Sequence, residues 1–471
     1  MDDIDQEKIM KEIEKQASKM KDKDKGEEPN TLTEEELKIL QEASHDKSMF
    51  MDKDGNINHV EEIEFIVQDV LKHQLKAFKI KRDLEEIKET VEEVEGYVNH
   101  LEERDYAPHD SAALKYLNQE LISDQRNVIF FLIRRIGINL LTGKSIMNVS
   151  MPIKIFEASS FLEKIARDFR YAPHYFKQAM ETVGIIERVK LITIWHMVTL
   201  HLEPQMHKPF NPILGETFQG VIGEYEIAIE QIWHHPPIAA FQMWTTKYEN
   251  APYWDGYLAF EASTGMTTIS GYKRGKIRVV FPDNEQEIVA HAFPEFEMKG
   301  LMKGDRTFDY LKGLKVSDYE NNVHADIVVN PDKKGWFRRM FSSSQKTAYD
   351  HVDGVISDSE DFEFKDYRGT ELTKIEKDND IQIYHKLQGN WTTSYKVDDE
   401  EVWNKNYRHL TVQYVNNPLP SDWRFRKDLI ALLNKDWYKA QEYKDELENI
   451  QRNDRKLRKK AMDQLKKAKK K

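Results

Sequence analysis

The sequence predicts a mixed α+β protein in which helices precede a large antiparallel sheet or barrel. Two helical segments, FLEKIARDFRYAPHYFKQAM and IIERVKLITIWHMVTLHL, lie before Pro212. After Pro212 the hydrophobic period changes to two, and strand-like runs such as FQGVIGEYEIAIEQIW and KIRVVF alternate with Gly, Pro, Asn and Asp turns. From Asp422 the chain is again helical, and a basic C-terminal helix is expected over residues 436–471.

The N-terminal third differs from the rest in composition. Residues 1–30 are rich in Lys, Glu and Asp and predict a charged, disordered tail. Residues 31–105 predict a helical region, because a capped helix begins at TLTEEEL and apolar residues then recur at three–four spacing. Residues 106–124 are expected to be a linker to a domain over 125–471. Within that domain, residues 341–380 are rich in Ser, Asp and Glu and predict an acidic inserted loop.

One loop in the helical region resembles the middle of an EF-hand. Its first ligand position falls on Phe50, which has no oxygen to offer. A structural relic or a pairing surface is therefore the favoured interpretation, and calcium binding is the weaker alternative. The candidate calcium ligands are Asp52, Asp54, Asn56, Asn58 and Glu61.

Composition restricts the compartment and the partners. The chain has no cysteine, which excludes disulfides and thiolate metal sites and indicates a reducing, cytoplasmic compartment. The charged N-terminus does not resemble a signal peptide, and Arg134 and Arg135 interrupt the most apolar run. A soluble protein is expected. The acidic N-terminal third argues against nucleic-acid binding, whereas the basic C-terminal tail suits an anionic membrane surface.

The stretch EQIWHHPPI, from Glu230 to Ile238, places two histidines before two prolines. Proline lacks an amide proton and disfavours helix in the preceding residue, so the histidines are expected at a strand end near the rim of a sheet. Zinc would need further ligands that the neighbouring residues do not supply, and no nucleophile motif accompanies the pair. A structural role at the rim, binding of an anion, and catalysis or metal binding remain as alternatives.

Two motifs give a resemblance to a known family. EQIWHHPP, together with KPFNPILGE from Lys208 to Glu216, resembles the two signatures of the oxysterol-binding-protein-related family, whose fingerprint is EQVSHHPP. Ile232 replaces the family's Val, and Trp233 replaces its Ser. MNVSMPIKI, a GWF triplet, LQGNW and the closing KDELENIQRNDRKLRKK follow the family pattern in order. The resemblance covers roughly residues 125–460.

The resemblance implies a near-closed antiparallel β-barrel around an internal lipid tunnel, with N-terminal helices, a lid and C-terminal helices. The lid would be about residues 126–141, although a buried core helix is the alternative. Phosphatidylinositol 4-phosphate would bind with its acyl chains inside and its head at the rim, in exchange for sterol or phosphatidylserine. The candidate lid and tunnel contacts are Val128, Phe130, Phe131, Ile133, Ile136 and Leu140.

The head-group residues are carried over position by position. Lys208, His234 and His235 match phosphate-contacting positions, and Asn211 matches an asparagine near the head group. The residues Lys444, Glu448 and Arg452 match the basic–acidic–basic set of the closing helix. A phosphomonoester carries nearly two negative charges and prefers charge-assisted donors. Spacing of four places the closing-helix set on one face, which is also typical of a solvated salt-bridge ladder.

The sequence therefore predicts an intracellular lipid-transfer protein and not an enzyme, with lipid ligands and no cofactor. It would associate peripherally with membranes, including organelle contact sites. The alternative is a lipid sensor or scaffold that does not shuttle and that attaches to a partner, or to a second copy, through its N-terminal helices. The identity of the second lipid, the membranes served and the role of Trp233 stay open.

Overall fold

The computed structural model describes residues 106–109, 113–136, 151–204, 207–234, 236–265, 267–329, 350–364 and 370–468. The expected tail and helical region of residues 1–105, with the candidate calcium ligands, lie outside the described residues, as do Leu140 and His235. All described elements belong to the compact unit Leu71–Asp463, apart from the end of the last helix.

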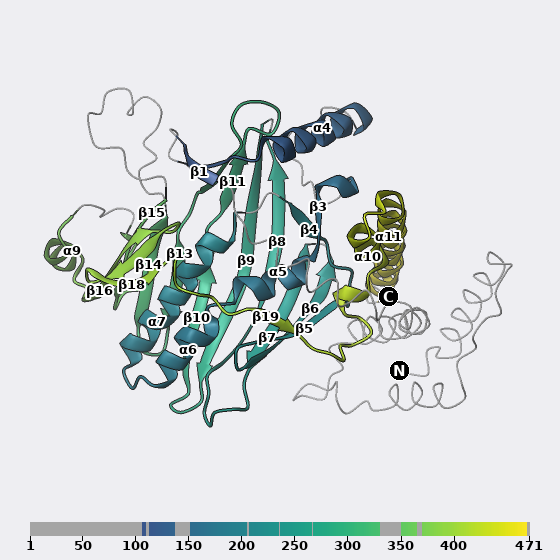
Figure 1. The fold of residues 1–471 in the computed structure, drawn as a ribbon. Coiled ribbons are helices and arrows are strands. Elements are labelled where there is room, and N and C mark those ends of the chain that lie inside the picture. The colour runs from purple at the N-terminus through teal and green to yellow at the C-terminus, as the bar shows by residue number, and fades with distance from the viewer. Residues whose placement is uncertain are drawn as a thin grey trace, which may run out of the picture. The chain divides into compact units, whose positions relative to one another are not determined.

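A single antiparallel sheet forms most of this unit (Figure 1). Its described strands are β1 (Tyr106–His109), β2 (Ala113–Tyr116), β5 (Thr217–Ile222), β6 (Tyr225–His234), β7 (Pro237–Trp244), β8 (Tyr253–Thr264), β9 (Thr268–Phe281), β10 (Gln286–Ala292), β11 (Phe296–Lys299), β12 (Thr307–Tyr310), β13 (Leu314–Asp318), β14 (Val323–Val329), β15 (His351–Ser357), β16 (Ile383–Asn390), β17 (Ser394–Val397), β18 (Glu400–Asn404) and β19 (Val412–Tyr414). Strands β3 (Phe156–Ser160) and β4 (Lys208–Phe210) form a separate parallel pair.

The helices are α4 (Gln119–Ile136), α5 (Phe161–Asp168), α6 (Ala172–Met180), α7 (Ile185–Val198), α9 (Leu372–Asn379), α10 (Lys427–Leu433) and α11 (Trp437–Ala468). Short 3₁₀ turns occur at η5 (Ile153–Ile155), η6 (Thr199–Leu202) and η8 (Trp423–Phe425). The predicted α+β class with a large antiparallel sheet is confirmed.

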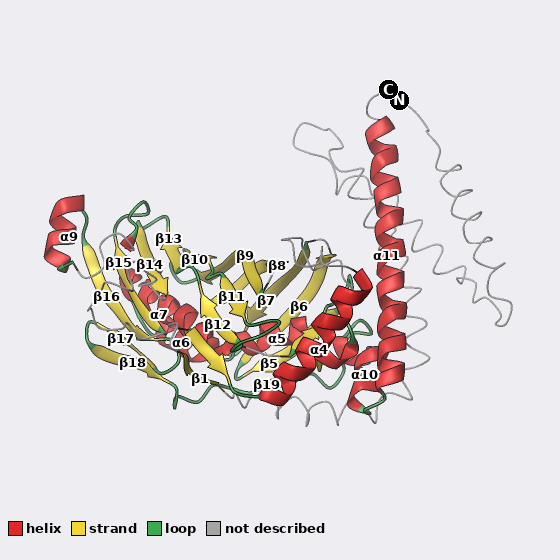
Figure 2. Ribbon diagram, turned by 90° about the horizontal axis from the view of Figure 1, so that it is seen from above, coloured by secondary structure: helices red, strands yellow, loops and turns green. Residues whose placement is uncertain are grey.

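Strand β9 joins the two halves of the sheet. It pairs with β8 along its length, while its other edge pairs first with β11 at residues 268–271 and then with β10 at residues 277–281. One half continues through β8, β7, β6, β5 and β19, and the other through β13 to β18. The sheet curves around its core (Figure 2). Among the described ladders, none joins the outer strands β18 and β19 to each other.

Helices α5 and α7 pack against the sheet, with α5 on β5 and β6 and α7 on β10, β13 and β14. Helix α7 is buried along most of its length because its residues are apolar on almost every side, as expected of a core helix. Phe169 and Trp254 meet edge to face at 4.0 Å within this core. The Tyr395 and Tyr310 hydroxyls donate to the carbonyls of Met197 and Leu200, so buried polar groups at the end of α7 and in η6 are satisfied.

Two segments differ from the sequence prediction. Residues 106–124 contain β1, β2 and the start of α4 in place of a linker, because Leu114 and Tyr116 are buried where β2 pairs with β12. Within 341–380, the expected inserted loop contains β15, which lies between β14 and β16 in the sheet. The acidic composition concealed the apolar positions Val352, Val355 and Ile356 of this strand, all of which are fully buried.

Helices α4 and α11 overlap the predicted lid and the predicted C-terminal helix, respectively. Helix α4 begins at Gln119, seven residues before the expected start of the lid, and the Asn118 side chain accepts a hydrogen bond from the Leu121 amide at 3.0 Å. Helix α11 occupies most of the predicted C-terminal helix at 436–471. Within the described residues, no helix has the length and apolar character needed to cross a membrane.

Candidate anion-binding site

The HHPP stretch forms the tip of a hairpin, as its prolines predict. Strand β6 ends at His234 and β7 begins at Pro237, and these two residues are directly opposite each other. A bulge between Gln231 and Trp233 disrupts the ladder just before the tip. Its consequence is that the consecutive side chains of Ile232 and Trp233 are 44% and 43% exposed.

Helix α11 lies beside this hairpin tip. The Gln451 side-chain nitrogen is 3.4 Å from His234 Nδ1 and 3.3 Å from the carbonyl oxygen of Pro212. Residues from β6, from the β4–β5 connection and from α11 therefore converge, although more than 200 positions separate Gln451 of α11 from His234 and Pro212. Of the predicted head-group residues that the structure describes, Lys208 is on β4, Asn211 is in the β4–β5 connection, His234 is on β6, and Lys444, Glu448 and Arg452 are on α11.

Two lysines from different elements share one aromatic ring. The Nζ atoms of Lys208 on β4 and Lys444 on α11 are 5.1 Å and 5.4 Å from the centroid of Phe156. Phe156 is held in this position because β3 pairs with β4 in parallel, with Phe156 opposite Lys208. The Lys208 ammonium donates to the Asn211 side-chain oxygen and to the Pro209 carbonyl at 3.3 Å. Lys208, Asn211 and Lys444 are thus brought together.

The positive charges in this cluster are under-compensated. Burial, followed by the charges of Lys444 and Arg426, lowers the pKa of Lys208 to about 7, even though Glu448 raises it in part. Lys444 is only 3% exposed and donates to Glu448. A bound anion would offset both the desolvation of Lys208 and the repulsion between the two lysines.

Glu448 links the two cations of α11. One of its carboxylate oxygens accepts from Lys444, and the other accepts from Arg452 Nη2 at 2.9 Å. Arg452 is largely solvated, whereas Lys444 is buried against Phe156. Lys444, Glu448 and Arg452 therefore form a continuous ion-pair chain from solvent to the lysine cluster. The buried Lys444–Glu448 pair differs from an ordinary surface salt bridge.

Sequence reasoning missed the residues that hold the loop next to Lys208 in place. Arg426 donates from Nη1 to the Asn211 carbonyl at 2.7 Å and to Glu216 at 2.8 Å, and from Nη2 to Asp428 at 2.7 Å. Glu216 also accepts from the Ile213 amide at 3.0 Å, which fixes the loop after Lys208. Glu216 belongs to the KPFNPILGE motif, but no local pattern connects it to Arg426.

A separate cavity lies between η6 and strands β9, β11 and β12. It has ≈ 310 Å³ of empty space, which includes its open side. Its lining is mainly apolar with a few polar groups, and consists of His196, Thr199, Leu200, Glu203, Lys273, Phe293, Pro294, Phe296, Tyr310 and Leu314.

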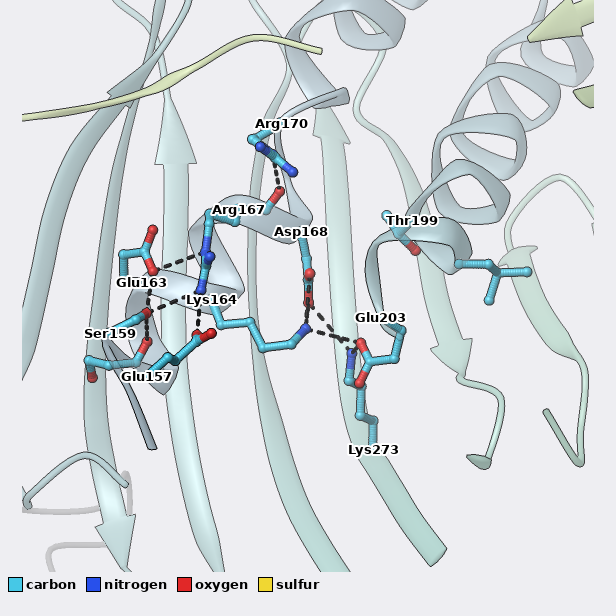
Figure 3. A network of polar contacts seen from close by, with 12 residues as sticks. Glu157, Ser159, Glu163, Lys164, Arg167, Asp168, Arg170, Thr199, Glu203 and Lys273 are labelled. Atoms are coloured by element: carbon cyan, nitrogen blue, oxygen red, sulfur yellow. Dashed lines mark hydrogen bonds and ion pairs between the residues drawn. The ribbon is translucent and has the colours of Figure 1, made fainter. Parts of the chain in front are cut away.

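The polar side of this cavity belongs to a buried ion network. Figure 3 shows Lys164, Asp168, Glu203 and Lys273 pointing toward one another, with the Lys164 ammonium 3.0 Å from Asp168 and 3.1 Å from Glu203. Burial alone would raise the pKa of Glu203, but Lys164 and Lys273 lower it to about 2. The network is internally balanced, unlike the Lys208–Lys444 cluster.

Among the described residues, no group of three or more His, Asp or Glu side chains is arranged to hold a metal ion. In α4, Val128 is buried and Phe130 is 41% exposed. Phe131, Ile133 and Ile136 lie on the same helix.

Comparisons with known proteins place the chain in a family. The family model for oxysterol-binding protein matches residues 138–469. The chain is 31% identical over 357 residues to oxysterol-binding protein 9 of Dictyostelium discoideum, which covers 75% of this chain and 81% of that relative. The chain belongs to the oxysterol-binding protein family.

Longer relatives match over only part of their length. Oxysterol-binding protein-related protein 5 of Mus musculus is 25% identical over 352 residues, covering 71% of this chain and 36% of the relative. Among solved structures, the Osh3 ORD of Saccharomyces cerevisiae in complex with PI(4)P has a TM-score of 0.52 at 20% identity, over 70% of this chain and 84% of that one. The Osh1 ORD in complex with ergosterol has a TM-score of 0.51 at 19% identity, over 70% and 80%. These structures share the fold.

Proposed function

We propose that this protein binds phosphatidylinositol 4-phosphate and exchanges it for a second lipid between membranes. The observation that carries the proposal is the cluster of Lys208 and Lys444 around Phe156, where burial and mutual repulsion favour an incoming dianion. The related Osh3 domain was solved with PI(4)P. No bond is broken in such an exchange, so no catalytic residue is assigned.

Each predicted head-group residue receives a role in this proposal. Lys208 and Lys444 provide charge-assisted hydrogen bonds to the 4-phosphate, and His234 and His235 donate to the same group. Arg452 adds a solvated cation, while Glu448 orients both cations of α11. Asn211 positions Lys208 and is itself held through the contact of its carbonyl with Arg426.

The lid and the membrane contacts follow from exposed apolar side chains. Helix α4 serves as the lid in this proposal, with Phe130 exposed toward whatever approaches the helix and Val128 buried. Trp233 and Ile232 project from the hairpin that carries His234, and tryptophan is favoured at membrane–water interfaces. The basic face of α11 would add attraction to anionic lipids. The protein is thus proposed to act in the cytoplasm on membrane surfaces.

The cavity at η6 favours sterol over phosphatidylserine as the second lipid. Its walls are mainly aromatic and aliphatic, and its few polar groups are the His196 imidazole, a threonine hydroxyl and an ion pair that is already satisfied. A single sterol hydroxyl would find a donor or acceptor at Thr199 or Glu203, whereas a charged serine head group would disturb the balanced network.

The direct test measures movement of phosphatidylinositol 4-phosphate between two vesicle populations. Wild-type protein is expected to transfer the lipid, and Lys208→Met or the double change His234→Ala and His235→Ala should slow transfer by about 10–100-fold, the value of a lost charged hydrogen bond. Lys247→Met is the matched control, because this lysine is exposed and paired with Glu224. Unchanged transfer in both site variants would refute the proposal.

The alternative is a sensor or scaffold attached through its N-terminal helices. Deletion of residues 1–105 distinguishes the two functions. A scaffold would lose its cellular localisation while keeping lipid binding, and its full-length form would show no transfer activity. A transfer protein would keep measurable transfer in the deleted form.

A further inference from the structure

One buried arginine outside the head-group site has no carboxylate partner among the residues that the structure describes. Arg306 precedes β12 and is only 3% exposed. Its Nη1 donates to the Gln125 side chain of α4 at 2.6 Å, but its Nε and Nη2 have no hydrogen-bond acceptor. The adjacent carboxylate, Asp305, is instead paired with Lys115 at 2.9 Å and with His109 at 3.2 Å.

Other buried arginines among the described residues are paired with carboxylates. Arg167 pairs with Glu157 and Glu163, and Arg426 pairs with Glu216 and Asp428. Such pairing is the rule, because a buried charge without a partner destabilises the folded state. Arg306 departs from this rule.

A second arginine, Arg126, contacts the loop that precedes Arg306. Arg126 of α4 follows Gln125, and its Nη2 donates to the Gly300 carbonyl at 3.1 Å and to the Gly304 carbonyl in the loop before Arg306. The buried Nε of Arg126 also has no acceptor. Burial, and then the charge of Arg126, lower the pKa of Arg306 to about 10, so the Arg306 guanidinium stays charged at neutral pH and is repelled by that of Arg126.

Unused N–H donors on two adjacent guanidinium groups fit one chemical class of ligand. A planar guanidinium presents paired N–H groups that match the oxygens of a phosphate or carboxylate. A tetrahedral phosphate can accept from two arginines at once and offset both charges. A neutral ligand would leave the repulsion in place.

We propose that Arg126 and Arg306 form a second oxyanion site, which takes a phosphate group at the junction of α4 with the loop before β12. The phosphate would come from a phospholipid or from a free phosphate, and the donors are the same in both cases. Because Gln125 and Arg126 belong to α4, occupancy of this site also fixes the start of that helix on the sheet. The site shares no residue with the Lys208–Lys444 cluster.

The test uses the full-length chain carrying Lys208→Met, which weakens phosphate binding at the first site. Its thermal unfolding is followed with inorganic phosphate or with soluble dioctanoyl phosphatidic acid, each against sodium chloride at matched ionic strength. A ligand that binds only the folded chain raises the melting temperature in proportion to its occupancy. We expect such a rise, and we expect Arg126→Gln to weaken the apparent affinity at least about tenfold.

Control variants make the outcome specific. Arg274→Gln changes an exposed arginine that is paired with Glu261, and it should keep the full rise. Arg126→Lys keeps the positive charge and should keep part of the rise in melting temperature. Arg306→Lys, with circular dichroism as a check of folding, is the second test variant and should also weaken binding.

The two ligands separate the sources of the phosphate. A rise with inorganic phosphate supports a site open to free phosphate, and a rise with phosphatidic acid alone supports a lipid phosphate. The proposal is overturned if neither ligand raises the melting temperature, or if folded Arg126→Gln and Arg306→Lys keep the full rise. Since Lys208 is replaced in every variant, any binding that remains at the first site is the same in all of them, and the difference between variants reports on Arg126 and Arg306.

Discussion

Lys208 lies where three electrostatic effects meet. Its ammonium is desolvated, is repelled by Lys444 beside the same Phe156 ring and is also repelled by Arg426, so its pKa falls from the ordinary lysine range to about 7. In the lipid-free chain this residue therefore changes charge near neutral pH. A phosphate beside it would raise its pKa again, because an opposite charge favours the protonated form.

This difference predicts a pH-dependent affinity for phosphatidylinositol 4-phosphate. Below pH 7, Lys208 is protonated both in the lipid-free chain and in the lipid complex, so it contributes no pH dependence to the affinity. Above pH 7 the free chain loses the proton that the complex retains, so affinity should fall with rising pH, by up to about tenfold per unit. Vesicle-binding titrations between roughly pH 7 and 9 measure the slope.

Lys208→Arg is the matched variant for this measurement, because arginine stays charged across the range. Its affinity should be nearly flat with pH while that of the wild type falls. Equal slopes in the two proteins would show that another group is responsible.

Some residues of the lysine cluster could be predicted from the sequence, and others could not. Lys208, Asn211, His234, Lys444 and Glu448 were predicted from motifs, and the structure brings their segments together. Arg426, Phe156 and Gln451 were not predicted. Their contacts join residues far apart in the chain, and such contacts leave no local spacing or period to read.

At the scale of elements, β9 is the strand at which the curved sheet changes pairing partners. One edge of the strand changes partner from β11 to β10 between Gly271 and Ile277. Gly275 lies in this interval with a φ of +154°, and a Cβ there would be 1.9 Å from the Tyr257 carbonyl oxygen. The absence of a side chain therefore permits the close approach of β8 to β9 at the bend.

Gly275→Ala is expected to destabilise the protein by about 1–3 kcal/mol through backbone strain and displacement of β8. Lys276→Ala, at the exposed neighbouring position, should change stability by less than about 0.5 kcal/mol. Urea unfolding of the two variants measures the difference. A neutral Gly275→Ala would mean that the bend does not depend on this glycine.

Element prediction succeeded where periodicity was clear and failed where composition obscured it. Strand β6 and helix α11 were expected from alternation and from a long charged helical pattern, and both are present. Strand β15 was expected to be a loop, because aspartates and serines surround its buried valines. Strand β2 is only four residues long, and its identity depends on pairing with β12, which lies about 190 residues away.

At the scale of the whole molecule, cations are distributed between two kinds of environment. Most buried arginines and lysines, such as those of the Lys164–Lys273 network, are balanced by carboxylates and stabilise the fold. The Lys208–Lys444 cluster and the Arg126–Arg306 pair are under-compensated. Under-compensated buried charge costs stability, which is the usual consequence of building a ligand site before the ligand arrives.

The central claim is that the Lys208–Lys444 cluster binds the 4-phosphate of a phosphoinositide. Native mass spectrometry of the full-length chain, after incubation with vesicles of phosphatidylinositol 4-phosphate, tests it most directly. We predict one bound molecule per wild-type chain and strong loss of occupancy in Lys208→Met and Lys444→Met. Phosphatidylinositol, which lacks the monoester, should bind far less. Equal occupancy in the wild type and both variants, or equal binding of the two lipids, would contradict the account.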